Sequence, residues 1–307
     1  MSFDIVTVGS AVMDVFVKTD LPEKSGFTQV PTGCKVLVRE LWRSSGGGGT
    51  NAAASFSRLG FKTGFLGILG EDENGDSILK ELKKEKVQFL GRRVNEPSGY
   101  SVVLDSVKNN RTILVYKGAN VNLEFKKVKT RWLYLASMID KSLRTQIKLA
   151  RWAVGNGIKV AYNPSSYVIE NSKRNVEAIC KNCEILVLND KEAQDLVGSV
   201  DFKKLLALGP RVVCVTFGKK GNRVSDGKGE WVSKPNAVEI LERTGAGDAF
   251  ASGFVFGYIK FGDVVSAMKL GSANAESVIQ KPGAKNGLLF FKEAVGKMKK
   301  IKVVKRI

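Results

Sequence analysis

The stretch ERTGAGDAF, residues 242–250, places three small residues directly ahead of a carboxylate, and an apolar, helix-like run follows. Gly245, Ala246 and Gly247 would then lie at the amino terminus of a helix that begins near Asp248. Unpaired N–H groups and the helix dipole favour an anion there, and small residues let it approach the backbone. The stretch predicts an anion site beside Asp248, and an ordinary glycine turn capped by Asp248 is the alternative.

A second glycine cluster, GGGGTN at residues 46–51, also leads into a helix-like run. Gly47 and Gly48 would let a ligand pack against the backbone, and the Asn51 amide offers a donor and an acceptor to a hydroxyl group. A flexible loop without a ligand is the alternative. The cluster predicts a second ligand-contacting segment, far from the first in the sequence.

Strand-like and helix-like patterns alternate along most of the chain. Apolar runs such as FDIVTVG and CEILVLN are followed by amphipathic helical patterns. This alternation predicts an α/β fold with a doubly wound, mostly parallel sheet flanked by helices. Residues 11–43 and 98–118 break the pattern and predict a small accessory β-sheet that acts as a lid, with a hairpin turn at 108–110. We find no linker, and residues 1–307 are expected to form a single domain.

The composition excludes several kinds of chemistry. The 307 residues contain no histidine, which rules out Ser/His triads and histidine acid/base catalysis. Cys180 and Cys183 form a CxxC without a second pair, which favours a structural role, and four scattered cysteines suit a reducing compartment. There is no basic leader, and no apolar run is long enough to span a bilayer. We therefore expect a cytoplasmic protein without membrane contact.

The formal net charge of +19 raises nucleic acid or phosphorylated ligands as partners. The lysines, however, are spread along the chain in short runs such as LKKEK and EFKKVK, on what look like solvated helix faces. We therefore expect a small-molecule ligand and no nucleic-acid partner.

Together, GGGGTNAAASFSRLG and RTGAGDAF resemble the two signature regions of the ribokinase-like, or PfkB, family of carbohydrate and nucleoside kinases. Other segments resemble the family in the same order: GSAVMDVFV with Asp14, GEDENGD with Asp72, YKGAN with Asn120, NDKE with Asn189, and TFGKKG with Thr216. The resemblance covers essentially the whole chain. It implies a ribokinase-like fold and an ATP-dependent kinase that phosphorylates a hydroxymethyl group of a small sugar.

The resemblance also implies a role for each matching residue. Asp248 would be the catalytic base, and Gly245, Ala246 and Gly247 would form the anion hole for the transferring phosphoryl group. The other roles follow by position: Asp14, Gly47, Gly48 and Asn51 for the substrate, Asn189, Thr216, Gly218, Gly221 and Asn274 for ATP, and Glu192 for Mg²⁺ through water. The lid would close over the substrate and exclude water.

Two positions depart from the family pattern. Relatives carry Asp-Thr ahead of TGAGD, where the Asp helps to bind an activating monovalent cation, and this chain carries Glu242-Arg243. The longer side chain leaves activation by K⁺ through Glu242 open. Ribokinases usually have Lys in the first glycine cluster, and Gly48 stands there instead. Ribose is therefore one substrate among several.

The sequence leaves several alternatives open. A nucleoside would need an apolar slot for its base, and a sugar phosphate would need a basic clamp. Candidates for the slot are Phe16, Val36 and Tyr100, and candidates for the clamp are Lys35, Arg39, Arg111 and Lys117. The alternative of another class is a non-catalytic ribokinase-like protein that binds nucleic acid or a protein partner. A homodimer through the lid is the assembly to be tested.

Overall fold

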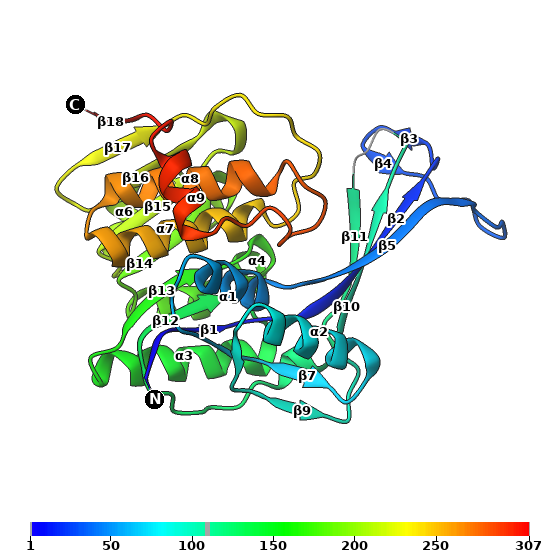
Figure 1. The fold of residues 1–307 in the computed structure, drawn as a ribbon, viewed down its shortest axis with the longest axis horizontal. Helices are drawn as coiled ribbons and strands as arrows, with labels where there is room; N and C mark the ends of the chain where they lie inside the picture. Colours follow the sequence, from blue (N-terminus) through cyan, green and yellow to red (C-terminus); the bar gives the residue numbers. More distant parts are fainter. Residues whose placement is uncertain (1, 108–110, 307) are drawn as a thin grey trace.

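The computed structural model describes residues 2–107 and 111–306 (Figure 1). The strands of its main sheet are β1 (Phe3–Val8), β6 (Thr63–Leu66), β8 (Gln88–Phe89), β12 (Thr130–Ala136), β13 (Lys159–Asn163), β14 (Ile185–Asn189), β15 (Val212–Thr216), β16 (Asn222–Ser225), β17 (Glu230–Ser233) and β18 (Val303–Arg306). Within the described residues they run in the order β18-β17-β16-β15-β14-β13-β12-β1-β6-β8. Neighbours from β15 to β8 pair in parallel, and β15 to β18 pair antiparallel.

Helices cover both faces of this sheet. On one face lie α1 (Gly48–Arg58), α7 (Ala246–Phe261), α8 (Val264–Val278) and α9 (Phe291–Met298), and on the other lie α3 (Asp140–Gly155), α4 (Ser166–Cys180), α5 (Asp190–Val197) and α6 (Phe202–Ala207). Successive strand side chains point to opposite faces, so Ile5 of β1 packs in the first layer while Val6 and Val8 pack in the second. The predicted doubly wound, mostly parallel sheet is confirmed.

A separate four-stranded sheet projects from the main body as an arm (Figure 1). Its strands are β2 (Val12–Thr19), β5 (Val38–Gly46), β10 (Gly99–Asp105) and β11 (Arg111–Tyr116), in the order β11-β10-β2-β5. We call this sheet the lid. β10 and β11 pair antiparallel, as a hairpin requires, and the turn predicted at 108–110 lies outside the described residues. β5 ends at Gly46 and so leads directly into the second glycine cluster.

The far end of the lid carries β3 (Glu23–Lys24) and β4 (Phe27–Thr28) (Figure 1). The other elements are β7 (Ile68–Gly70), β9 (Arg92–Val94), α2 (Glu73–Lys84) and the short 3₁₀ turns η1 (Gly118–Asn122) and η2 (Gly218–Lys220). Asp72 caps α2 by accepting from the N–H of Gly75 at 2.7 Å, and it also accepts from the N–H of Ser98 at 2.7 Å. Asn120 exchanges two hydrogen bonds with the backbone of Ala11, at 2.9 and 2.8 Å. The GEDENGD and YKGAN segments thus fix the points where lid strands leave the body.

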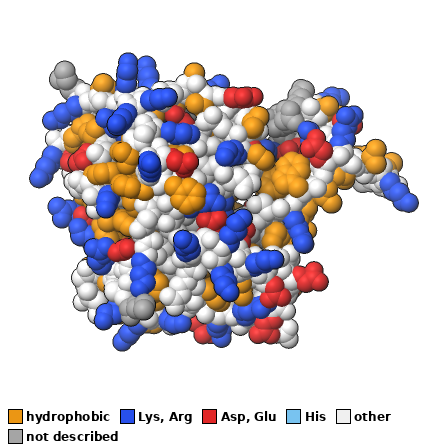
Figure 2. Space-filling model, in the orientation of Figure 1, with side chains coloured by type: hydrophobic (Ala, Val, Ile, Leu, Met, Phe, Trp, Pro, Cys, Tyr) orange, Lys and Arg blue, Asp and Glu red, His pale blue; other side chains and the backbone are white. Residues whose placement is uncertain are grey.

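The surface gives no sign of one dominant charged patch on the face in Figure 2, where Lys and Arg side chains are scattered among Asp and Glu. Apolar side chains gather along the lid in the same view. Within residues 2–107 and 111–306, the structure contains no helix with the length and apolar composition that a membrane span requires.

Candidate active site

The first turn of α7 offers free backbone donors. Gly245 caps the helix with a φ of +78°, and a Cβ on it would lie 2.6 Å from Cα of Ala284, so only glycine fits without a shift. The N–H of Ala246 donates to the Arg243 carbonyl at 3.2 Å. The N–H groups of Gly247 and Asp248 have no hydrogen-bond partner among the described residues. An anion at this helix terminus would therefore accept from the N–H groups of Gly247 and Asp248, because the N–H of Ala246 already donates to Arg243.

Asp248 is held by a residue from the other glycine cluster. Nδ2 of Asn51, in α1, donates to Oδ2 of Asp248 at 2.8 Å. The Asn51 side chain is buried, and its Oδ1 has no partner among the described residues. Burial raises the pKa of Asp248, and the hydrogen bond from Asn51 and the charge of Lys285 oppose that rise. A buried acceptor without a partner beside a carboxylate is a place where a ligand hydroxyl could donate.

The second glycine cluster brings backbone close to two carboxylates. A Cβ on Gly46 would lie 1.9 Å from Oδ2 of Asp14, and one on Gly48 would lie 3.4 Å from Oδ1 of Asp248. Gly47 has a φ of +94° and caps α1. The cluster is therefore a tightly packed strand-to-helix turn, not a flexible loop, and it lies close to Asp14 at Gly46 and to Asp248 at Gly48.

A buried lysine, which sequence reasoning missed, lies near both carboxylates. Lys285 is 5% exposed, and its Nζ contacts Ser45 at the end of β5 and Glu81 of α2 at 3.2 Å. Burial lowers the pKa of Lys285, and the Glu81 charge opposes this. Burial raises the pKa of Asp14, while a hydrogen bond from Ser101 and the charge of Lys285 lower it. In the sequence, Lys285 is marked only by its position directly after Gly283-Ala284. No local pattern there predicts its contacts with Ser45 and Glu81.

Two of the predicted nucleotide residues, Asn189 and Thr216, lie side by side at the carboxyl edge of the main sheet. Asn189 ends β14 and pairs in register with Thr216, which ends β15. Asn189 and Glu192 form a capping box at the start of α5, with the Glu192 N–H donating to Asn189 Oδ1 at 2.8 Å and the Asn189 N–H donating to Glu192 Oε2 at 2.9 Å. β13 alone separates β14 from β12, which lies beside β1 in the sheet.

Other nucleotide candidates differ in what they can offer. Gly218, with a φ of +55°, is exposed, and a Cβ there would meet no atom within 4 Å. Gly221 is required by packing, because a Cβ on it would lie 1.9 Å from the Ser233 carbonyl oxygen. Asn274 needs a correction. It is 0% exposed, and its amide is used by Ser55, Ala249 and the N–H of Leu289, so it joins α8 to α1 and α7 and has no surface to contact ATP.

Glu242 is buried just ahead of residues 245–247. Its Oε2 accepts from the N–H of Gly283 at 2.7 Å, and its Oε1 accepts from Arg111 of β11 at 3.2 Å. Arg111 is thus committed to carboxylates and is not free to clamp a substrate phosphate. Arg39, another clamp candidate, pairs with Asp20 on the exposed edge of the lid.

The three candidates for an apolar slot that would bind a nucleoside base differ in how accessible they are. Phe16 is 1% exposed and stacks on Trp42 with ring centroids 5.0 Å apart, so its face is already covered. Val36 is exposed, and Tyr100 is half-buried. Cys180 and Cys183 lie buried in the core, where burial raises the pKa of Cys180 to about 12, as suits inert thiols.

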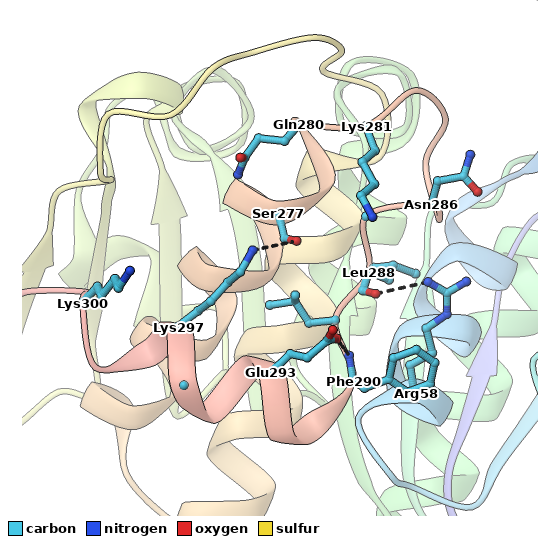
Figure 3. Close-up of a pocket in the computed structure, with 13 residues that line it drawn as sticks. Arg58, Ser277, Gln280, Lys281, Asn286, Leu288, Phe290, Glu293, Lys297 and Lys300 are labelled. Carbon is cyan, nitrogen blue, oxygen red and sulfur yellow. Dashed lines mark hydrogen bonds between the residues drawn. The ribbon is translucent and has the colours of Figure 1, made fainter.

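A cavity of about 570 Å³ opens elsewhere, between α8 and α9 (Figure 3). In it, Lys297 donates to Ser277 at 3.2 Å, and Glu293 accepts from the backbone N–H of Phe290 at 2.9 Å. Arg58 of α1 closes one side. None of the sequence-predicted site residues is among the described residues that line it, so this cavity is separate from the candidate active site.

Comparisons with known proteins identify the family and the fold. Residues 2–289 match the model of the pfkB family carbohydrate kinases. An uncharacterized sugar kinase of Archaeoglobus fulgidus is 30% identical over 76% of this chain and 97% of its own length. Among solved structures, a nucleoside kinase of Methanocaldococcus jannaschii (20% identity, TM-score 0.84) and Arabidopsis thaliana ribokinase complexed with ribose and ATP (24% identity, TM-score 0.83) share the fold, each over 97% of this chain and 99% of the other.

Proposed function

Because the chain belongs to the pfkB family of carbohydrate kinases, we propose that it transfers the γ-phosphoryl group of ATP to a hydroxymethyl group of a small sugar. The observation that carries the proposal is the contact between the two glycine clusters, where Asn51 holds Asp248 at the start of α7. One carboxylate, two unpaired N–H groups and one unpaired buried amide oxygen converge there. They match the needs of a hydroxyl that must lose a proton beside a phosphoryl group.

Asp248 acts as the base in the proposed reaction. Phosphoryl transfer passes through a loose transition state, so proton removal is needed late and a well-placed carboxylate suffices. The N–H groups of Gly247 and Asp248 stabilise the charge that develops on the phosphoryl oxygens. Asn51 orients the carboxylate through Nδ2, and its Oδ1 accepts from a substrate hydroxyl. Asp14 accepts from a second hydroxyl, and the lid closes over both.

ATP binds along the carboxyl edge of β14 and β15 in this proposal, with Asn189, Thr216 and Gly218 as contacts. Glu192 is buried, and it accepts from the Asn189 N–H at 2.9 Å and from the Ser166 hydroxyl at 3.3 Å. This fits an indirect role in which Glu192 holds Mg²⁺ through water, because Mg²⁺ keeps several waters. Bound Mg²⁺ would neutralise phosphate charge. A kinase supplied with ATP is expected in the cytoplasm.

The substrate panel is the direct test. We favour a sugar because Phe16 is covered by Trp42 and two of the four clamp candidates are already in ion pairs. A coupled assay with ATP and Mg²⁺ over pentoses, hexoses, their phosphates and nucleosides should give the highest kcat/KM with an unphosphorylated sugar. If a nucleoside or a sugar phosphate gave the highest kcat/KM, the proposed mechanism would stand and that compound would be the acceptor. No turnover at all, with salt-sensitive binding of RNA or DNA, would support a non-catalytic protein instead.

We further propose a homodimer through the lid. β11 is an edge strand, and its residues 113–116 are all about half exposed although they are apolar or aromatic. Such a strand invites pairing with a second copy. Sedimentation should therefore give twice the 33.4 kDa chain mass, and Leu114→Lys should give the single-chain mass. Val154→Lys, at an exposed apolar position of α3, is the matched control and should stay dimeric. Wild-type protein that sediments at 33.4 kDa at all concentrations would refute the dimer.

A further inference from the structure

Arg111 joins the lid to the segment that leads into α7. Its Nε donates to Oδ1 of Asp105 on β10 at 3.0 Å. Its Nη1 donates to Oε1 of Glu242 at 3.2 Å and to Oγ1 of Thr244 at 2.7 Å. Thr244 directly precedes Gly245, the cap of α7. One side chain of the lid is therefore bonded to the residues that set where the anion-hole helix begins.

The carboxylates around Arg111 need a positive charge. Asp105 is 6% exposed and Glu242 is 5% exposed. Burial raises the pKa of Asp105, and Arg111 opposes this rise both by its charge and by its hydrogen bond. Two buried carboxylates that share one guanidinium would repel each other without it. A positive charge between the two carboxylates relieves this repulsion.

A monovalent cation does not fit beside Glu242 as this site is built. Such a cation would need free carboxylate and carbonyl oxygens around it. Here one Glu242 oxygen accepts from Gly283 and the other accepts from Arg111, so hydrogen-bond donors face the oxygens that a cation would use. The guanidinium would also repel it. In this chain the Arg111 side chain lies where the family resemblance implies a monovalent cation.

We propose that the Arg111 guanidinium takes the place of a monovalent cation in this chain, so that the lid itself supplies the charge that positions the start of α7. Arg111 is then a positioning residue, since it acts through Glu242 and Thr244. When the lid moves, its charge moves with it, and lid closure and anion-hole geometry are coupled. The catalytic consequence rests on the proposed function, whereas the cation independence of the fold does not.

Thermal unfolding tests the cation without any substrate. Wild-type protein should melt at the same temperature in KCl and in choline chloride at equal ionic strength. Arg111→Ala should melt lower in choline chloride, and K⁺ or methylguanidinium should raise its melting temperature by entering the vacated space. Arg39→Ala removes an exposed lid ion pair with Asp20 and should respond to neither cation. A wild-type melting temperature that rises in K⁺, or an Arg111→Ala protein that ignores both cations, would overturn the proposal.

Kinetics tests the coupling to the active site. With ATP and the acceptor ribose or adenosine, wild-type kcat should agree within about twofold between K⁺ and choline. Arg111→Ala should lower kcat at least about tenfold, the effect of losing a charged hydrogen bond, and methylguanidinium should restore part of it. The kcat of Arg111→Lys should lie between those of the wild type and of Arg111→Ala. An unchanged kcat in Arg111→Ala would refute the coupling. Absence of wild-type turnover with every pentose, hexose, sugar phosphate and nucleoside of the substrate panel would count against the proposed function and leave the melting result standing.

Discussion

Asp248→Asn is expected to lower kcat by at least about a hundredfold, the low end for a lost acid/base group. Asn is nearly isosteric and keeps an oxygen that can accept from Asn51, so the geometry at the start of α7 should persist. Nucleotide binding should change little. Steady-state kinetics and a nucleotide titration check both statements. Turnover close to that of the wild type would remove Asp248 from the mechanism.

The same substitution should leave the protein as stable as before, or more stable, at neutral pH. Because burial raises the pKa of Asp248 above its ordinary value of 3.8, the folded protein holds this proton more tightly than the unfolded chain. The resulting stabilisation is present in acid and is lost as pH rises through the raised pKa, so at neutral pH the charged group opposes folding. Asn removes that penalty.

The pH dependence of the rate follows from the same shift. The base must be ionised, so wild-type kcat should fall in acid as pH drops through a pKa above 3.8. The Asp248→Asn protein should lose this limb. A melting temperature several degrees lower in the variant would point to a structural role for the carboxylate instead.

Local patterns predicted the parts of this protein that depend on neighbours in sequence. The alternation of strand and helix patterns predicted the parallel sheet, because strands that are buried on both faces have almost continuously apolar sequences. The lid strands were predicted from the loss of that alternation. The sequence predicted a helix that begins near Asp248, and α7 begins two residues earlier, at Ala246, with Gly245 as its cap. The family resemblance then added roles to positions that these patterns had located.

The contacts that join distant segments could not be predicted in this way. Arg111 and Glu242 are 131 residues apart, and their pairing depends on how the lid folds against the body. The buried position of Lys285 likewise depends on β5 and α2 meeting near it. Asn274 looked like a ligand contact by position, but helix packing consumes its amide. The NDKE segment did carry a usable signal, since Asn followed by Glu three residues later is a capping box.

The two glycines on either side of Ala246 should separate structural from catalytic needs. Gly245→Ala forces alanine into a left-handed conformation and drives its methyl group to 2.6 Å from Ala284. The conformation alone costs about 1–2 kcal/mol. The melting temperature should therefore fall, and kcat should fall about a hundredfold because the N–H groups at the start of α7 move.

Gly247→Ala is the matched control for stability, because a Cβ at position 247 would meet no atom within 4 Å and the residue has no positive φ. Alanine also favours helix, so the melting temperature should stay level or rise. Its methyl group would nevertheless stand in the open space that the transferring phosphoryl group needs, and kcat should fall without loss of stability. If Gly247→Ala kept full turnover, the phosphoryl group could not pass over this turn; if both variants melted equally early, the glycines would serve packing alone.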